Sequence, residues 1–332
     1  MRVSVTGRIA LGAGVAALLL VAAVEISPWP SALLIRWAFD ASGERANASL
    51  ASLVPAKITA HPDEIYDPGD PDARLDVFYP DDPQAGQGLL TIVWIHGGGF
   101  VSGSKDQIAN YARILAGSGY AVAGVDYSVA PGSTYPTPLL QVNQALAYLA
   151  RNAQRLHVDP RRLVLAGDSA GAQLAAQLAN VITSPAYART VGITPSIAPG
   201  QLVGVLLYCG PYAMTGSVTG GPFARWFART VQWSYSGRRD YARDPRGATL
   251  AVENFVTPGF PPTFISVGNG DSLASQSYAL AEALRREGVR VDALFFARGY
   301  RPELPHEYQF FLDTEEARLA LNRSQRFLVS LR

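Results

Sequence analysis

The chain of 332 residues has a single cysteine, Cys209, and only four histidines. One cysteine excludes an intrachain disulfide, so the fold depends on its hydrophobic core. Cys209 ends an apolar run and is expected to pack as a small hydrophobic residue. No cluster of cysteine and histidine has metal-ligand spacing, and neither a dinucleotide-binding glycine motif nor a P-loop occurs. We therefore expect neither a metal nor any other cofactor.

The chain also lacks an excess of either charge. It has 28 lysines and arginines against 27 acidic residues, and its formal net charge is +1 at pH 7. This balance offers no electrostatic basis for binding nucleic acid or an acidic partner. With 48% hydrophobic residues the chain can bury a large core, and α/β chains of this length often form one domain with an insertion.

The sequence GDSAG at residues 167–171 stands between an apolar run, residues 162–166, and a helix-forming run, residues 172–179. A strand, a sharp turn and a helix make G-x-S-x-G a nucleophile elbow, in which flanking glycines leave room for a strained serine. We predict that Ser169 is a nucleophile with its Oγ exposed above the sheet. Asp168 is predicted to be a structural hydrogen-bonding residue.

A second motif follows the apolar run of residues 89–95. That run has the pattern of a strand buried on both faces. The run leads into His96 and three consecutive glycines. Each glycine weakens regular structure by roughly 0.5–1 kcal/mol relative to alanine, so three together indicate a loop whose N–H groups approach a ligand closely. Acyl transfer needs such donors for the oxyanion of its transition state. We assign the oxyanion hole to the N–H groups of Gly98, Gly99 and Ala170.

Three motifs carry a resemblance to a known family. They are HGGG at residues 96–99, GDSAG at residues 167–171 and VDYSVAP at residues 125–131, the last similar to a D-Y-R-L-A-P-E segment. In these motifs the chain resembles the α/β-hydrolases of the hormone-sensitive-lipase-like group of carboxylesterases, with Ser128 as one departure. The resemblance runs from about residue 58 to the C-terminus. It implies an α/β-hydrolase fold that performs acyl transfer without a cofactor.

The general base follows from the chain order of serine, acid and histidine in this fold. His61, His96 and His157 precede Ser169, and only His306 follows it. His306 stands in a proline-rich loop after a predicted strand, where the fold places its base. His96 is expected to hold the glycine loop through a side-chain hydrogen bond.

The acid of the triad is predicted to be Asp271, which ends the predicted strand of residues 262–268. Its role is to orient the imidazole and stabilise the protonated form. Asp292 is the competing candidate, but it lies inside the next predicted strand. Asp244 and Glu253 fall in a less regular region.

Between the motifs, strand and helix patterns alternate, which predicts a mostly parallel central sheet with helices on both faces. Residues 74–79 are predicted to form an early antiparallel strand. Residues 211–258 interrupt the alternation with an aromatic, helical centre and resemble the family's cap insertion over the acyl pocket, with ordinary peripheral helices as the alternative. The catalytic domain is thus predicted to span residues 58–332 with this cap inserted.

An uncharged run at residues 9–24 follows Arg2 and Arg8. As a helix it would be about 24 Å long, a little short of a ~30 Å hydrocarbon core. We predict an N-terminal membrane anchor in residues 1–30, with the catalytic domain outside the cytoplasm. A cleaved signal peptide, which would leave a secreted or periplasmic protein, is the alternative. Residues 31–57 are predicted to form a linker helix that completes the cap or lies on the membrane surface.

Together these observations predict a membrane-anchored serine carboxylesterase that hydrolyses short to medium acyl esters of small molecules through an acyl-enzyme. The same triad serves amidases, peptidases and acyltransferases, which are alternatives. A non-catalytic binding protein on a hydrolase scaffold is another alternative. Such receptors lose the histidine, whereas His306 is present here.

Overall fold

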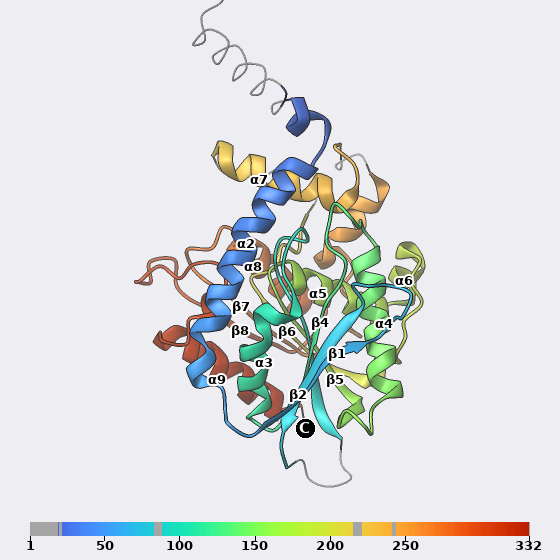
Figure 1. Ribbon diagram of the computed structural model, residues 1–332, viewed down its shortest axis with the longest axis vertical. Coiled ribbons are helices and arrows are strands. Elements are labelled where there is room, and N and C mark those ends of the chain that lie inside the picture. The colour runs from blue at the N-terminus through green and yellow to red at the C-terminus, as the bar shows by residue number, and fades with distance from the viewer. Residues whose placement is uncertain (1–18, 20–21, 83–87, 215–220, 241–243, 332) are drawn as a thin grey trace, which may run out of the picture.

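The computed structural model describes residues 19, 22–82, 88–214, 221–240 and 244–331 (Figure 1). Within them, eight strands form one sheet in the order β1-β2-β4-β3-β5-β6-β7-β8. Strand β2 pairs antiparallel with β1 and β4, and every other neighbouring pair is parallel. The strands are β1 Ile58–Ile65, β2 Arg74–Pro80, β3 Leu89–Ile95, β4 Ala121–Val125, β5 Val158–Asp168, β6 Leu202–Tyr208, β7 Thr263–Val267 and β8 Val291–Phe295. The helices are α2 Trp29–Ser49, α3 Ala109–Ala116, α4 Thr137–Arg151, α5 Ala170–Thr183, α6 Pro185–Val191, α7 Pro222–Ser236, α8 Ala274–Arg286 and α9 Glu315–Val329.

Helices cover both faces of the sheet, because alternate side chains of a strand point to opposite faces. In β3, Val93 and Ile95 belong to a core shared with α4, α5 and α8. Ile92 and Trp94 belong to a second core shared with α3 and α9. The predicted fold class, a mostly parallel sheet with helices on both faces, is therefore confirmed.

Two helices lie beside each other above the sheet. Figure 1 shows α2 crossing near α7 at the end of the molecule where the central strands finish, and the two helices are in contact. Helix α2 also contacts α3 and the 3₁₀ helix Lys105–Ile108 that precedes it. Segments more than a hundred residues apart in sequence thus meet above the carboxyl edge of the sheet.

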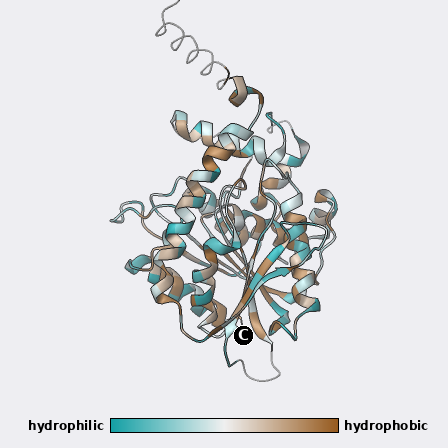
Figure 2. Ribbon diagram, in the orientation of Figure 1, coloured by the Kyte–Doolittle hydropathy of each residue, from teal (hydrophilic) through white to brown (hydrophobic). Residues whose placement is uncertain are grey.

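The prediction of a membrane-anchored protein is wrong on this structure. Among the described residues, no helix is both long enough and apolar enough to cross a membrane. The long N-terminal helix α2 carries Arg36, Asp40, Glu44 and Arg45, and Figure 2 shows hydrophilic residues interspersed along it. Most of the uncharged run of residues 9–24, namely residues 9–18, 20 and 21, lies outside the described residues.

Candidate active site

Ser169 occupies a sharp turn between β5 and α5. Its backbone angles are φ 49° and ψ −119°, in a region that residues with side chains rarely adopt. A Cβ atom on Gly167 would come within 2.5 Å of the Gly171 carbonyl carbon, and one on Gly171 within 2.0 Å of the Ile95 carbonyl oxygen. Both positions therefore require glycine, and the turn holds Ser169 above the end of the sheet.

The structure brings Ser169, His306 and Asp271 together from loops that follow β5, β8 and β7. His306 Nε2 lies 2.9 Å from Ser169 Oγ, and His306 Nδ1 lies 2.7 Å from Asp271 Oδ2. The second carboxylate oxygen of Asp271 accepts a hydrogen bond from the Leu273 N–H at 2.8 Å. The Asp271 side chain is fully buried and His306 is 38% exposed, so the line of hydrogen bonds runs from the interior toward open space.

The environment of His306 acts on its pKa in two directions. Burial alone would lower this pKa, because it penalises the charged imidazolium. Contacts with Cys209, Asp271 and Glu307 oppose this effect, and the net result is a pKa well above the ordinary histidine value. The imidazolium form is therefore stabilised at this position.

The competing acidic residues lie elsewhere. Asp292, in β8, forms an ion pair with Arg323 on α9. Asp244 pairs with Arg246 at 2.7 Å, and burial raises the pKa of Glu253, which lies in a short 3₁₀ helix. Within the described residues, His306 forms its hydrogen bonds with Asp271 and Ser169 and with none of these three carboxylates.

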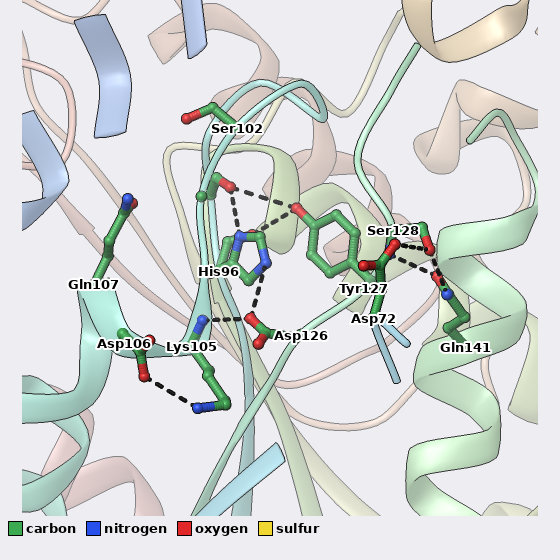
Figure 3. Close-up of polar contacts among 12 residues, drawn as sticks. Asp72, His96, Ser102, Lys105, Asp106, Gln107, Asp126, Tyr127, Ser128 and Gln141 are labelled. Atoms are coloured by element: carbon green, nitrogen blue, oxygen red, sulfur yellow. Dashed lines mark hydrogen bonds and ion pairs between the residues drawn. The ribbon is translucent and has the colours of Figure 1, made fainter. Parts of the chain in front are cut away.

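The glycine loop, which begins at His96, is supported by a stacked pair of rings. Figure 3 shows His96 and Tyr127 face to face, with ring centroids 4.2 Å apart and planes 8° apart. Tyr127 Oη donates to the His96 carbonyl oxygen at 2.9 Å. Burial lowers the pKa of His96 to about 4, so its ring is neutral at pH 7, and its Nδ1 lies 2.8 Å from the Gly97 carbonyl oxygen. His96 thus bonds the loop as expected from sequence.

Charged residues support the same loop at its far end. Asp126 Oδ1 accepts from the Lys105 backbone N–H at 2.6 Å, and it lies 3.8 Å from His96 Nε2 (Figure 3). Burial raises the pKa of Asp126 to about 7. The Lys105 ammonium, only 5% exposed, contacts Asp76 and two further carboxylates at 3.0 Å each, so its buried charge is compensated.

Helix α2 clamps this loop from above. Arg36 Nε donates to the Val101 carbonyl oxygen at 2.6 Å, one of two carbonyls that the guanidinium contacts. One turn later, Asp40 Oδ1 accepts from Ser102 Oγ at 2.6 Å and from the Gly103 N–H at 3.2 Å. Sequence reasoning missed this role of α2. The signal that the sequence offered was the pair Arg36 and Asp40, two opposite charges spaced by four residues among apolar neighbours.

Asp168, the residue before Ser169, connects the turn to β3 and lies against the glycine loop. Its Oδ1 accepts from Trp94 Nε1 at 2.7 Å. Burial raises its pKa well above the ordinary carboxyl value, and the neighbouring Glu307 carboxyl raises it further. A Cβ on Gly97 would fall within 2.3 Å of Asp168 Oδ2 and 2.9 Å of Glu307 Oε1. The first glycine of the loop is therefore required by the close approach of these carboxyls.

A cavity of about 1360 Å³ opens over Ser169 and His306. Its walls come from the glycine loop, from α2 and from α7. The side facing Gly99 is apolar, since Phe39, Phe227 and Val231 all lie within 3.6–3.7 Å of the position of a Cβ on that residue. The space is large enough to hold a small-molecule substrate, which usually needs about 300–1,000 Å³.

A profile of the family described as alpha/beta hydrolase fold matches residues 92–302. This match covers more than half of the chain. The chain belongs to this family. The resemblance that the motifs carry and the predicted fold are thereby confirmed.

Solved structures of esterases are similar over nearly the whole chain. Esterase B from Lactobacillus rhamnosis superposes with a TM-score of 0.80 at 23% identity, covering 93% of this chain and 96% of its own. An esterase from Pyrobaculum calidifontis superposes with a TM-score of 0.71 at 26% identity, covering 90% of this chain and 93% of its own. A thermostable carboxylesterase cloned from a metagenomic library superposes with a TM-score of 0.68 at 25% identity, covering 89% of this chain and 97% of its own.

Proposed function

We propose that this chain is a serine carboxylesterase in which Ser169 is the nucleophile, His306 the general base and Asp271 the orienting acid. The observation that carries the proposal is the continuous line of hydrogen bonds Asp271–His306–Ser169 at the mouth of the cavity. Family membership and the esterases similar at 25% and 26% identity support the same conclusion. The protein is a carboxylic ester hydrolase.

The reaction proceeds in two halves. Ser169 Oγ attacks the ester carbonyl while His306 Nε2 takes its proton, and the imidazolium returns that proton to the leaving alcohol. Water, activated by the same imidazole, then hydrolyses the acyl-enzyme. Asp271 orients the imidazole through its hydrogen bond with Nδ1 and stabilises the imidazolium that forms.

The oxyanion is bound by the N–H groups of Gly98, Gly99 and Ala170. Support comes from the cavity wall, which contains both glycines beside Ser169, and from Ala170, which begins helix α5. Gly98 and Gly99 adopt φ of 101° and 60°, a conformation suited to glycine. Preorganised donors of this kind are usually the largest electrostatic contribution to acyl transfer.

Residues 211–258 and helix α2 form the cap over the catalytic domain of residues 58–332. Helix α7 supplies Phe227 and Val231 to the cavity, and the ring of Phe227 lies 5.6 Å from that of Phe39 on α2. This apolar roof supports binding of short to medium acyl chains. An ester of this kind is the proposed substrate.

Replacing the nucleophile tests the proposal directly. Ser169→Ala is expected to lower kcat for p-nitrophenyl butanoate by on the order of 10⁶-fold, because no alkoxide can form. The protein should also lose labelling by a fluorophosphonate probe. Ser275→Ala, which changes another serine of the cavity wall, should keep both activity and labelling. Near wild-type turnover by a folded Ser169→Ala variant would refute the mechanism.

Two aspartates test the assignment of the acid. Asp271→Asn should lower kcat by about 10⁴-fold, because the imidazole loses the acceptor that fixes its tautomer. Asp292→Asn removes only the ion pair with Arg323 and should leave kcat nearly unchanged. Steady-state kinetics on the two purified variants, compared at equal folded fraction, decides the assignment, and the opposite ranking would overturn it.

The roof predicts how activity depends on acyl length. Across p-nitrophenyl esters from acetate to palmitate, kcat/KM should be highest for short to medium chains. Phe227→Ala should shift the optimum toward longer chains, because it removes a ring from the cavity wall. Phe223→Ala is the matched control on α7, since its side chain is 75% exposed. An optimum at palmitate in the wild type would contradict the proposed substrate class.

The clamp by α2 predicts an effect on rate more than on binding. Asp40→Ala should lower kcat by about tenfold or more with little change in KM, because a displaced glycine loop weakens contacts made only in the transition state. Asp40→Asn retains an acceptor oxygen and should recover part of the loss. Glu44→Ala, an exposed position one turn along α2, is the control. A rise in KM with unchanged kcat for Asp40→Ala would show that α2 acts only as a wall.

A further inference from the structure

The buried cysteine faces the candidate triad. Cys209 follows the last residue of β6 and adopts φ 46°, outside the usual range for a residue with a side chain. Its side chain is buried, and its Sγ lies within 4.8 Å of a ring nitrogen of His306. The proposed ester hydrolysis uses no thiol, so this side chain has no part in the mechanism.

The thiol completes a set of three potential metal ligands. The ligand atoms of Cys209, Asp271 and His306 all lie within 4.8 Å of one another, and no other such group of three occurs in the part of the chain that the structure describes. A thiolate, an imidazole and a carboxylate are the ligand types that zinc uses in proteins. Residue spacing gave no sign of this set, because the three residues follow three different strands.

The three ligand atoms, all within 4.8 Å of one another, can reach the distances of a zinc site through shifts of the side chains. With bonds of about 2.0–2.3 Å, the ligand atoms of a tetrahedral zinc ion stand about 3.3–3.6 Å apart. The His306 and Asp271 atoms are now 2.7 Å apart, so small shifts of the side chains would admit the ion. Access is available from the cavity, since His306 lines it and is 38% exposed. Water from the cavity would supply the fourth ligand.

We propose that Cys209, His306 and Asp271 form an inhibitory site for a soft divalent cation such as Zn²⁺ or Cd²⁺. The cation enters through the substrate cavity and binds in place of the proton between the imidazole and the carboxylate. The inhibitory consequence rests on the proposed esterase function, whereas the binding itself does not.

Cation binding prevents His306 from acting as the base, because the metal occupies one of its ring nitrogens. The Cys209 thiol releases its proton to solvent as the metal–sulfur bond forms, and Asp271 exchanges a hydrogen bond for a metal bond. If the metal takes His306 Nδ1, the imidazole proton that Nδ1 carried moves to Nε2. That nitrogen can then no longer accept the proton of Ser169. If the metal takes Nε2, the accepting lone pair is occupied directly.

The ligand set also predicts selectivity among cations. Mg²⁺ and Ca²⁺ prefer six or more oxygen ligands, and this group offers one carboxylate. Thiolate and imidazole instead favour Zn²⁺ and Cd²⁺. At equal concentration, Zn²⁺ and Cd²⁺ should therefore inhibit the protein, whereas Mg²⁺ and Ca²⁺, which carry the same charge, should not.

The first experiment measures inhibition of the full-length protein after treatment with a chelator. Zn²⁺ and Cd²⁺ should inhibit hydrolysis of p-nitrophenyl butanoate, EDTA should restore it, and Mg²⁺ should have no effect. Cys209→Ala should raise the half-inhibitory Zn²⁺ concentration by roughly tenfold or more, relative to its own metal-free activity, since even residues behind metal ligands alter affinity by about 10–100-fold. His61→Ala is the control, because it removes a partly buried histidine near Glu64 that does not line the cavity. Equal inhibition of wild type and Cys209→Ala would overturn the proposal, as would loss of inhibition in His61→Ala.

The second experiment separates the metal site from the esterase function. Calorimetric titration of Ser169→Ala with ZnCl₂ should give one bound ion per chain, and the Ser169→Ala/Cys209→Ala protein should lose that binding while keeping its thermal transition. Absence of binding to Ser169→Ala overturns the metal site even if the wild type hydrolyses esters. Binding to Ser169→Ala, together with a wild type that hydrolyses no ester, supports the site and refutes the proposed function.

Discussion

The close approach of α5 to the end of β3 is the constraint on which the candidate site depends. Gly171, in the first turn of α5, stands so near the Ile95 carbonyl that a Cβ has no room there. This contact forces the turn at Ser169 into its strained conformation and sets the nucleophile directly beside the glycine loop that follows β3. The strain persists because β3 and β5 are neighbours in the centre of a sheet buried on both faces.

A second layer of interactions fixes the glycine loop itself, which has few side chains of its own. Tyr127 and His96 hold its beginning, Lys105 and Asp126 its far end, and α2 its outer side. These contacts lie in a region largely shielded from water, where hydrogen bonds are stronger and an unpaired polar group is costly. A loop of glycines, flexible in isolation, is thereby held in one conformation, as the proposed oxyanion donors require.

Sequence reasoning located the candidate site because its motifs carry their own backbone geometry. The turn at Ser169 is specified by local glycines, and the chain order of the fold leaves His306 as the candidate base. The contacts of Arg36 could not be predicted in this way, since its carbonyl partners lie 65 and 94 positions along the chain and nothing local identifies them. The membrane prediction rested on the hydropathy of residues 9–24 alone. The described helix that follows, α2, carries charged residues and packs Ile35 into the core, and no described helix is long and apolar enough to cross a membrane.

Helix α2 contributes both to the wall of the cavity and to the position of the glycine loop. Phe39 contributes to the wall of the cavity, and Asp40, the next residue, bonds the glycine loop. Because both belong to one rigid helix, a substrate that displaces the wall also displaces the proposed oxyanion donors. An acyl group of the right size leaves the helix in place and keeps the donors aligned, whereas a larger group costs both binding and rate. Selectivity for acyl size can therefore arise from kcat as well as from KM, through a helix that contributes no reacting atom.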